Sequence, residues 1–257
     1  MLILDFDGVL INSLAEVTLT VYQTTTGKRV TSLADLPPAL VRLFQRNRYH
    51  VQPIGDAILL MKWCLSNYQN DSEKILNPQE YLSVISGAAD PTAVRSRQIY
   101  ETRMNFANRD PQHWLALHQP YQPLWAELRK RKKCEFVILT NKNHEATCRL
   151  CRHFGLDIDA GNIYSGDLGV SKVESMRQVQ GRFGNVAFVF IDDSVKNLMD
   201  LDRCFNRESK TIALRFASWG YTGPEDEKLA RAKGYPVFKQ KDLIALLDSD
   251  RLPAGNS

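Results

Sequence analysis

The sequence predicts an α/β protein with a three-layer core of parallel strands and an inserted, mainly helical second domain. Short apolar runs alternate with helical patterns in the second half of the chain, which favours parallel strands joined by right-handed helical crossovers. In the first half, one apolar run is followed by helical pattern alone. This helical stretch of residues 13–118 is too long for one crossover helix. It predicts a domain of residues 13–118, inserted into a core of residues 1–12 and 119–257.

Each predicted strand is a short, continuous apolar run, as expected for strands that are buried on both faces. These runs are residues 2–4, 136–139, 186–191 and 211–214. Apolar side chains at helical spacing predict helices over residues 145–154, 172–180, 195–205, 224–233 and 241–248. In the fourth of these helices, Pro224 is expected at the first position and Gly234 just beyond the end.

The inserted region is helical by the same criteria. Apolar residues recur at helical spacing over residues 54–68. Two Asp-Pro pairs, at 90–91 and 110–111, each resemble a helix N-cap followed by a first-turn proline. We therefore expect several helices in this domain.

The composition is that of a globular chain, with 257 residues, a formal net charge of +4, 44% hydrophobic residues and 24% charged residues. No apolar run approaches the ~18 residues that a membrane helix needs, so no membrane partner is expected. The basic run at 129–133 fits the solvated end of a helix. Because no recognition motif accompanies it, we expect no nucleic-acid partner.

The five cysteines are irregularly spaced and do not indicate a disulfide framework, which favours a reducing, cytoplasmic location. No signal-peptide pattern precedes the first strand, in agreement with that location. Cys148 and Cys151 form a CxxC pair within an apolar helical stripe. Core packing is therefore favoured over a metal or redox role for this pair.

Two carboxylates follow the first strand in the segment Asp5-Phe6-Asp7-Gly8. Residues two apart in an extended chain point to the same side, and Gly8 allows the chain to turn directly after them. Two carboxylates at a buried strand end are costly without a cation beside them. The alternative is a solvated turn, in which Asp and Gly are also common.

Polar residues also follow the other predicted strands. Thr140 and Asn141 come at the end of the second strand, where a strand-to-helix turn can hold a phosphate. Lys172 begins a later helix, although a surface lysine is the ordinary alternative. Asp192 and Asp193 end the third strand, and their charge cost would be relieved by an oxygen-binding cation such as Mg²⁺.

In this order and spacing, the four elements resemble the motifs of the haloacid dehalogenase (HAD) superfamily. The matching segments are DFDGVL with Asp5 and Asp7, ILTNK with Thr140, GVSK with Lys172, and IDDS with Asp192 and Asp193. The insertion falls where members with a helical cap of the first type carry theirs. The resemblance covers the whole chain and implies a Rossmann-like core with a helical cap domain.

The resemblance implies a role for each matching residue. Asp5 corresponds to the nucleophile that becomes an aspartyl phosphate, and Asp7 to the general acid that later serves as base. Mg²⁺ would bind the Asp5 carboxylate, the Asp7 carbonyl and Asp193, with Asp192 beside them. The phosphoryl oxygens would be held by Thr140, the Asn141 amide and Lys172.

The function that the resemblance implies is Mg²⁺-dependent hydrolysis of a small phosphomonoester, similar to that of phosphoglycolate phosphatases. Dehalogenases of the superfamily lack a second Asp at the position of Asp7, so phosphoryl transfer is favoured here. Two alternatives stay open: a sugar-phosphate mutase with the same residues, and a non-catalytic regulatory protein on this scaffold. One departure is Val173, because many relatives have proline after the lysine. The partner expected in either enzymatic case is a small phosphorylated metabolite.

Two further groups of residues have open roles. Cations of the inserted domain either meet an anionic substrate or are ordinary surface charges; they are Lys28, Arg29, Arg95, Arg97 and Arg103. The segment Trp219-Gly220-Tyr221 resembles a loop common in HAD relatives and either borders the site or simply packs.

Overall fold

The computed structural model describes residues 1–131, 135–167, 170–184, 186–207 and 210–248. Part of the basic run (Lys132 and Lys133), Cys134, and Gly169 of the GVSK segment lie outside the described residues. The chain divides into two compact units. The sheet unit comprises Met1–Asn12 and Gln119–Ser257, and the helical unit comprises Ser13–His118.

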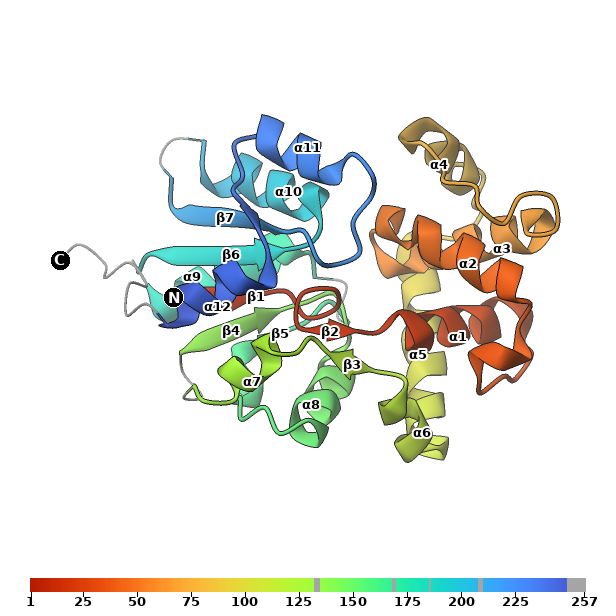
Figure 1. Cartoon of the computed structure of the whole chain (residues 1–257), viewed down its shortest axis with the longest axis horizontal. Coiled ribbons are helices and arrows are strands. Elements are labelled where there is room, and N and C mark those ends of the chain that lie inside the picture. The colour runs from red at the N-terminus through yellow and green to blue at the C-terminus, as the bar shows by residue number, and fades with distance from the viewer. Residues whose placement is uncertain (132–134, 168–169, 185, 208–209, 249–257) are drawn as a thin grey trace. The chain divides into compact units, whose positions relative to one another are not determined.

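The sheet unit contains a six-stranded sheet with the strand order β5-β4-β1-β6-β7-β8 (Figure 1). All neighbouring strands in it are parallel, which confirms the predicted α/β class. The strands are β1 (Leu2–Leu4), β4 (Phe136–Leu139), β5 (Ile163–Tyr164), β6 (Phe188–Asp192), β7 (Ile212–Ala217) and β8 (Val237–Phe238). A separate two-stranded ribbon of β2 (Ile11–Asn12) and β3 (Gln119–Pro120) lies where the chain leaves and re-enters this unit.

Helices flank this sheet, and successive side chains of its strands point to opposite faces. Ile3 and Val137 pack with side chains of α9 and α10 in one buried cluster, while their neighbours Leu2 and Ile138 are buried as well. Both faces are therefore covered. The helices of this unit are α7 (Leu124–Leu128), α8 (His144–His153), α9 (Lys172–Phe183), α10 (Val195–Phe205), α11 (Asp226–Ala232) and α12 (Gln240–Asp248).

Two element starts differ from the sequence prediction by two residues. The strand expected from residue 186 begins at Phe188, because Val186 is exposed and lies before the sheet. The helix expected to begin at Pro224 begins at Asp226. The Asp226 carboxylate accepts a hydrogen bond from the Gly223 amide, and this turn places the proline before the helix. At the other end, Gly234 has a φ of 79° just beyond the helix, as expected.

The helical unit has its own core, formed largely by α1, α2 and α3 with residues from α4 and α5. Its helices are α1 (Leu14–Thr26), α2 (Pro38–Asn47), α3 (Ala57–Asn67), α4 (Pro78–Ile85), α5 (Thr92–Arg109) and α6 (Pro111–Ala116). Short 3₁₀ turns are present at Leu33–Asp35, Arg48–His50 and Ile54–Asp56. Within the part of the chain that the structure describes, no helix is both long and apolar enough to span a membrane.

The two Asp-Pro pairs behave differently. Asp110 caps α6 through its side chain, which accepts a bond from the His113 amide, and Pro111 follows at the first helical position. At the other pair, α5 begins at Thr92, so Pro91 rather than Asp90 is the N-cap. The Asp90 carbonyl instead accepts a bond from the Arg95 guanidinium.

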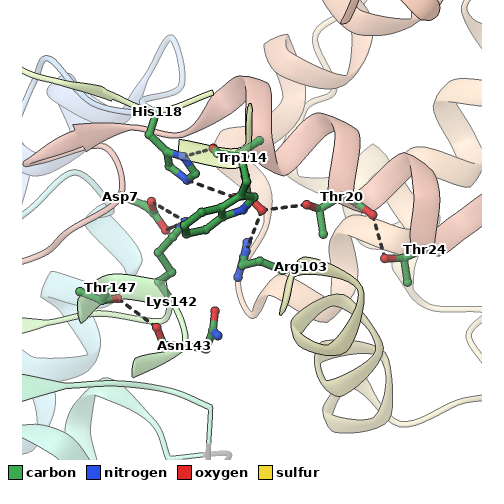
Figure 2. A network of polar contacts seen from close by, with 10 residues as sticks. Asp7, Thr20, Thr24, Arg103, Trp114, His118, Lys142, Asn143 and Thr147 are labelled. Carbon is green, nitrogen blue, oxygen red and sulfur yellow. Dashed lines mark hydrogen bonds and ion pairs between the residues drawn. The ribbon is translucent and has the colours of Figure 1, made fainter. Parts of the chain in front are cut away.

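Arg95 and Arg103 are buried ion-pair partners within the helical unit and are not exposed substrate-binding cations. Arg95 Nη2 lies 2.7 Å from Asp56 Oδ1, and Arg103 Nε lies 2.8 Å from Glu16 Oε1. The side chains of all four residues are at most 8% exposed. Figure 2 shows Arg103 within its polar network. Their charges are used inside this unit, which corrects the reading of them as surface cations.

Candidate active site

The first site segment follows β1 and turns sharply at Gly8. Asp5 is 6% exposed, and its amide continues the sheet by donating to the Ile191 carbonyl. Phe6 is fully buried and packs edge-on against Trp125, which fixes the backbone between the two carboxylates. Gly8 has a φ of 90°, a conformation that favours glycine. The tight turn thus keeps both carboxylates at the carboxyl end of β1.

The second pair of carboxylates lies at the end of β6, the strand beside β1. Asp192 is fully buried and Asp193 is 5% exposed. One carboxylate oxygen from each of Asp5, Asp192 and Asp193 lies within 4.8 Å of the others. The structure therefore brings three of the predicted site residues into one buried acidic cluster.

Lys172 is the cation that contacts this cluster. It begins α9 after the N-cap Ser171, and its side chain is 6% exposed. Its Nζ lies 2.8 Å from Asp5 Oδ1 and 2.6 Å from Asp192 Oδ2. The alternative of a surface lysine is therefore wrong.

Asp192 is held by donors from the protein on both of its oxygens. Besides Lys172, its Oδ2 accepts from Asn197 Nδ2 at 2.9 Å, and its Oδ1 accepts from the Ser194 amide at 2.8 Å. These contacts suit a residue that fixes the lysine. Asp5 and Asp193 are the more suitable pair of carboxylates for an added cation.

The cluster carries more negative charge than Lys172 can balance. Burial raises the pKa of Asp5 to about 7, with Asp192 adding to the rise and Lys172 opposing it. Burial also raises the pKa of Asp193 well above its ordinary value, and the nearby charges of Asp192 and Asp5 add to this effect. Burial lowers the pKa of Lys172, but the attraction of Asp192 and Asp5 outweighs it and the pKa is raised overall. An oxygen-coordinated divalent cation such as Mg²⁺ fits this donor set and this charge.

Thr140 and Asn141 follow β4, the other neighbour of β1. Because Ile138 pairs with Leu4, these residues come at the same edge of the sheet as Asp5. Thr140 is 2% exposed, and its hydroxyl accepts a bond from the Lys142 amide at 3.1 Å. The turn thus has the strand-end position that was predicted.

Sequence reasoning missed Lys142. Its side chain is fully buried, and its Nζ lies 3.2 Å from Asp7 Oδ1 (Figure 2). The only available signal was its place beside Thr140 and Asn141 in the segment ILTNK. Spacing alone cannot show that this lysine turns inward toward a carboxylate 135 residues away.

The Trp219-Gly220-Tyr221 loop borders the acidic cluster, which decides between its two predicted roles. The Tyr221 amide donates to Asp193 Oδ2 at 2.5 Å. The Trp219 indole N–H donates to the Val9 carbonyl at 3.0 Å and so ties this loop to the one that follows β1.

Comparison with solved structures shows that the chain has the fold of HAD-like hydrolases. A predicted phosphoglycolate phosphatase from Haemophilus somnus matches with a TM-score of 0.58 at 15% identity, covering 96% of each chain. A haloacid dehalogenase-like hydrolase from Streptococcus pneumoniae matches with a TM-score of 0.52 at 13% identity, covering 96% of this chain and 97% of the other. A HAD-superfamily hydrolase of subfamily IA from Geobacter sulfurreducens matches with a TM-score of 0.51 at 14% identity, covering 96% of this chain and 95% of the other. Comparisons with family models and with curated proteins found no match.

Proposed function

We propose that the protein is a Mg²⁺-dependent phosphatase that hydrolyses a small phosphomonoester through an aspartyl phosphate on Asp5. The observation that carries this proposal is the buried cluster of Asp5, Asp192 and Asp193 with Lys172 in contact. Transfer of a phosphoryl group needs a nucleophile and surrounding positive charge. This cluster supplies the nucleophile, and its excess negative charge favours the binding of a cation. In this proposal, the sheet unit is the catalytic core and the helical unit is the cap domain.

Each step of the proposed reaction can be assigned to a side chain. An Asp5 carboxylate oxygen attacks phosphorus, while the bond from phosphorus to the ester oxygen breaks and Asp7 donates a proton to the leaving oxygen. Asp7 then accepts a proton from water as that water attacks the aspartyl phosphate. The products are the alcohol and inorganic phosphate, with Asp5 and Asp7 restored.

The phosphate-binding side of the site would come from three residues. Lys172 lies beside Asp5 and can offset the charge of the phosphoryl oxygens. The Thr140 hydroxyl and the Asn141 amide, at the same strand edge, would donate to these oxygens.

A divalent cation has a defined place in this proposal. Asp5, Asp193 and the Asp7 carbonyl would hold Mg²⁺, which would shield the nucleophile and the phosphoryl group from mutual repulsion. Asp192 would fix Lys172 and stay outside the set of direct ligands, since both of its oxygens already accept hydrogen bonds.

The test is phosphate release from a panel of sugar phosphates, phosphoglycolate, nucleotides and amino-acid phosphates. We expect Mg²⁺-dependent turnover that Asp5→Asn abolishes without lowering the melting temperature, because the substitution removes charge from a crowded cluster. Glu101→Gln, which removes an exposed carboxylate of the helical unit, is the matched control and should leave turnover unchanged. Full activity in excess chelator, or substantial turnover by Asp5→Asn, would refute the proposal. A requirement for a catalytic bisphosphate would indicate a mutase instead.

A further inference from the structure

Lys142 is a buried lysine to which the resemblance to the HAD motifs gives no role. Its side chain is 0% exposed, and its Nζ lies 3.2 and 3.4 Å from the two carboxylate oxygens of Asp7. Lysine is rarely buried without an anionic partner. A fully buried ammonium within reach of both oxygens therefore indicates a specific contact and not an incidental surface pair.

The backbone that carries Lys142 is fixed independently of this contact. Its amide donates to Thr140 Oγ1, and Asn143, the next residue, is the N-cap of α8. The lysine is thus held between the end of β4 and the start of α8. From there it reaches Asp7, whose own side chain keeps 18% of its surface exposed. The ammonium contacts Asp7 from the protein interior and leaves part of the Asp7 side chain open to solvent.

The two buried lysines of the site have different partners. Lys172 contacts Asp5 and Asp192, whereas Lys142 contacts Asp7. One ammonium therefore lies beside the proposed nucleophile and the other beside the proposed proton donor. The two lysines therefore contact different carboxylates of the proposed site.

An aspartate on a loop can rotate about its side-chain bonds unless a partner selects one orientation. A charge-assisted contact to both oxygens supplies that selection. Proton transfer requires the carboxylate to meet the leaving oxygen in a defined orientation. Resting on the proposed function, we infer that Lys142 is a positioning residue that holds the Asp7 carboxylate in the orientation needed for proton transfer.

The first test is Lys142→Met. Methionine keeps the length and fills the buried space, and the partly exposed Asp7 can be solvated once the Lys142 ammonium is gone. For an alkyl phosphate we expect kcat to fall about 10- to 100-fold, because a misplaced general acid loses most of its contribution. KM should change less than about threefold, since the phosphoryl contacts stay in place. Lys62→Met, which replaces an exposed lysine of α3, is the control and should leave both constants unchanged.

A double-mutant cycle with Asp7→Asn separates positioning from direct binding. The rate in the Asp7→Asn background is read from the p-nitrophenol burst with p-nitrophenyl phosphate. If Lys142 acts through Asp7, then Lys142→Met should cost no further burst rate once Asp7 has been replaced. If Lys142 binds the phosphoryl group itself, the losses should multiply. Lys142→Ala with added propylamine gives a second readout, because a small ammonium in the vacated space should restore part of kcat. A merely structural lysine would show no such rescue.

A fall in kcat that vanishes in the Asp7→Asn background, together with amine rescue, supports the inference. Multiplying losses, a rise in KM at unchanged kcat, or an unchanged kcat would overturn it. If Lys142→Met melts well below wild type, Lys142→Gln and the amine rescue decide the same question. Wild-type protein without activity on any phosphomonoester would refute the proposed function itself, and the inference with it.

Discussion

Gly220 lies so close to Asp193 that a Cβ at position 220 would be 2.3 Å from both Cβ and Oδ2 of the aspartate. On the other side, a Cβ on Gly8 would lie 2.0 Å from the same Oδ2. The next residue of the loop, Tyr221, donates its amide to that oxygen. Asp193 is therefore enclosed by two loops, one after β1 and one after β7, and its carboxylate has little freedom to move.

Gly220→Ala should displace the Asp193 carboxylate and weaken cation binding. We expect the half-saturating Mg²⁺ concentration to rise about 10- to 100-fold, as is typical when groups that orient a metal ligand are altered. Titration of Mn²⁺ followed by electron paramagnetic resonance measures the same change without relying on turnover. Gly181→Ala is the control, since a Cβ there meets nothing within 4 Å and the site is helical. Equal cation affinity in Gly220→Ala and wild type would contradict the assignment of Asp193 as a ligand.

Without a divalent cation, the protein should lose stability as the pH rises toward 7. The pKa of Asp5 is raised from 3.8 to about 7 by burial, so between these values the folded protein keeps a proton that the unfolded chain releases. This contribution to the free energy of unfolding is full below pH 3.8 and is lost as the pH rises through about 7. The raised pKa of Asp193 acts in the same direction.

Urea unfolding in chelator, at about pH 5 and about pH 8, measures this dependence. We expect the loss of stability between the two values to be smaller in Asp5→Asn, which has no proton to release. Added Mg²⁺ should stabilise the wild type more at the higher pH, since it binds the ionised carboxylates. The same pH dependence in Asp5→Asn and wild type would show that Asp5 does not hold the proton.

Arg103 should be a stability determinant of the helical unit. Its guanidinium is buried beside Glu16, and removing it takes the neighbouring positive charge away from a fully buried carboxylate. We expect Arg103→Met to cost about 3–5 kcal/mol of unfolding free energy. Arg97→Met, which removes an exposed arginine of the same helix, should change stability by less than about 0.5 kcal/mol. Thermal unfolding followed by calorimetry compares the two. If both variants melted like wild type, the buried Arg103–Glu16 pair would not contribute to the stability of the protein.

The parts of the fold that the sequence predicts are those decided by local pattern. Buried parallel strands such as β4 must be apolar throughout, so their runs stand out, and Asp110 caps its helix by contacts within one turn. The sequence predicts Pro224 inside a helix. It gives no sign of the turn in which the Gly223 amide donates to the Asp226 carboxylate. Local signals thus give four of the six strands of the sheet, while β5 and β8, of two residues each, are too short to show a pattern. The exact starts of elements depend on such competing bonds.

The errors at the site and in the helical unit come from partners far apart in the chain. Arg103 pairs with a residue 87 positions away, and Lys142 with one 135 positions away. A cation looks the same in the sequence whether it is solvated or buried, because only the folded chain supplies its partner. The sequence singles out Asp5 and Asp193 because a carboxylate at the end of an apolar strand is costly in almost any fold.

The two proposed roles of Asp7 can be separated by the leaving group. As an acid, Asp7 assists an alkoxide, which is a poor leaving group, whereas p-nitrophenolate departs without a proton. As a base, it is needed for the water in the second step whatever the first substrate was. Asp7→Asn should therefore nearly abolish hydrolysis of alkyl phosphates. With p-nitrophenyl phosphate it should release a burst of at most about one equivalent of p-nitrophenol per enzyme, and then stall with phosphate on Asp5. Rapid-mixing absorbance measures the burst, and Asp5→Asn should show none. Equal proportional losses on both substrates without a burst would make Asp7 an electrostatic neighbour of the cluster and not its acid and base.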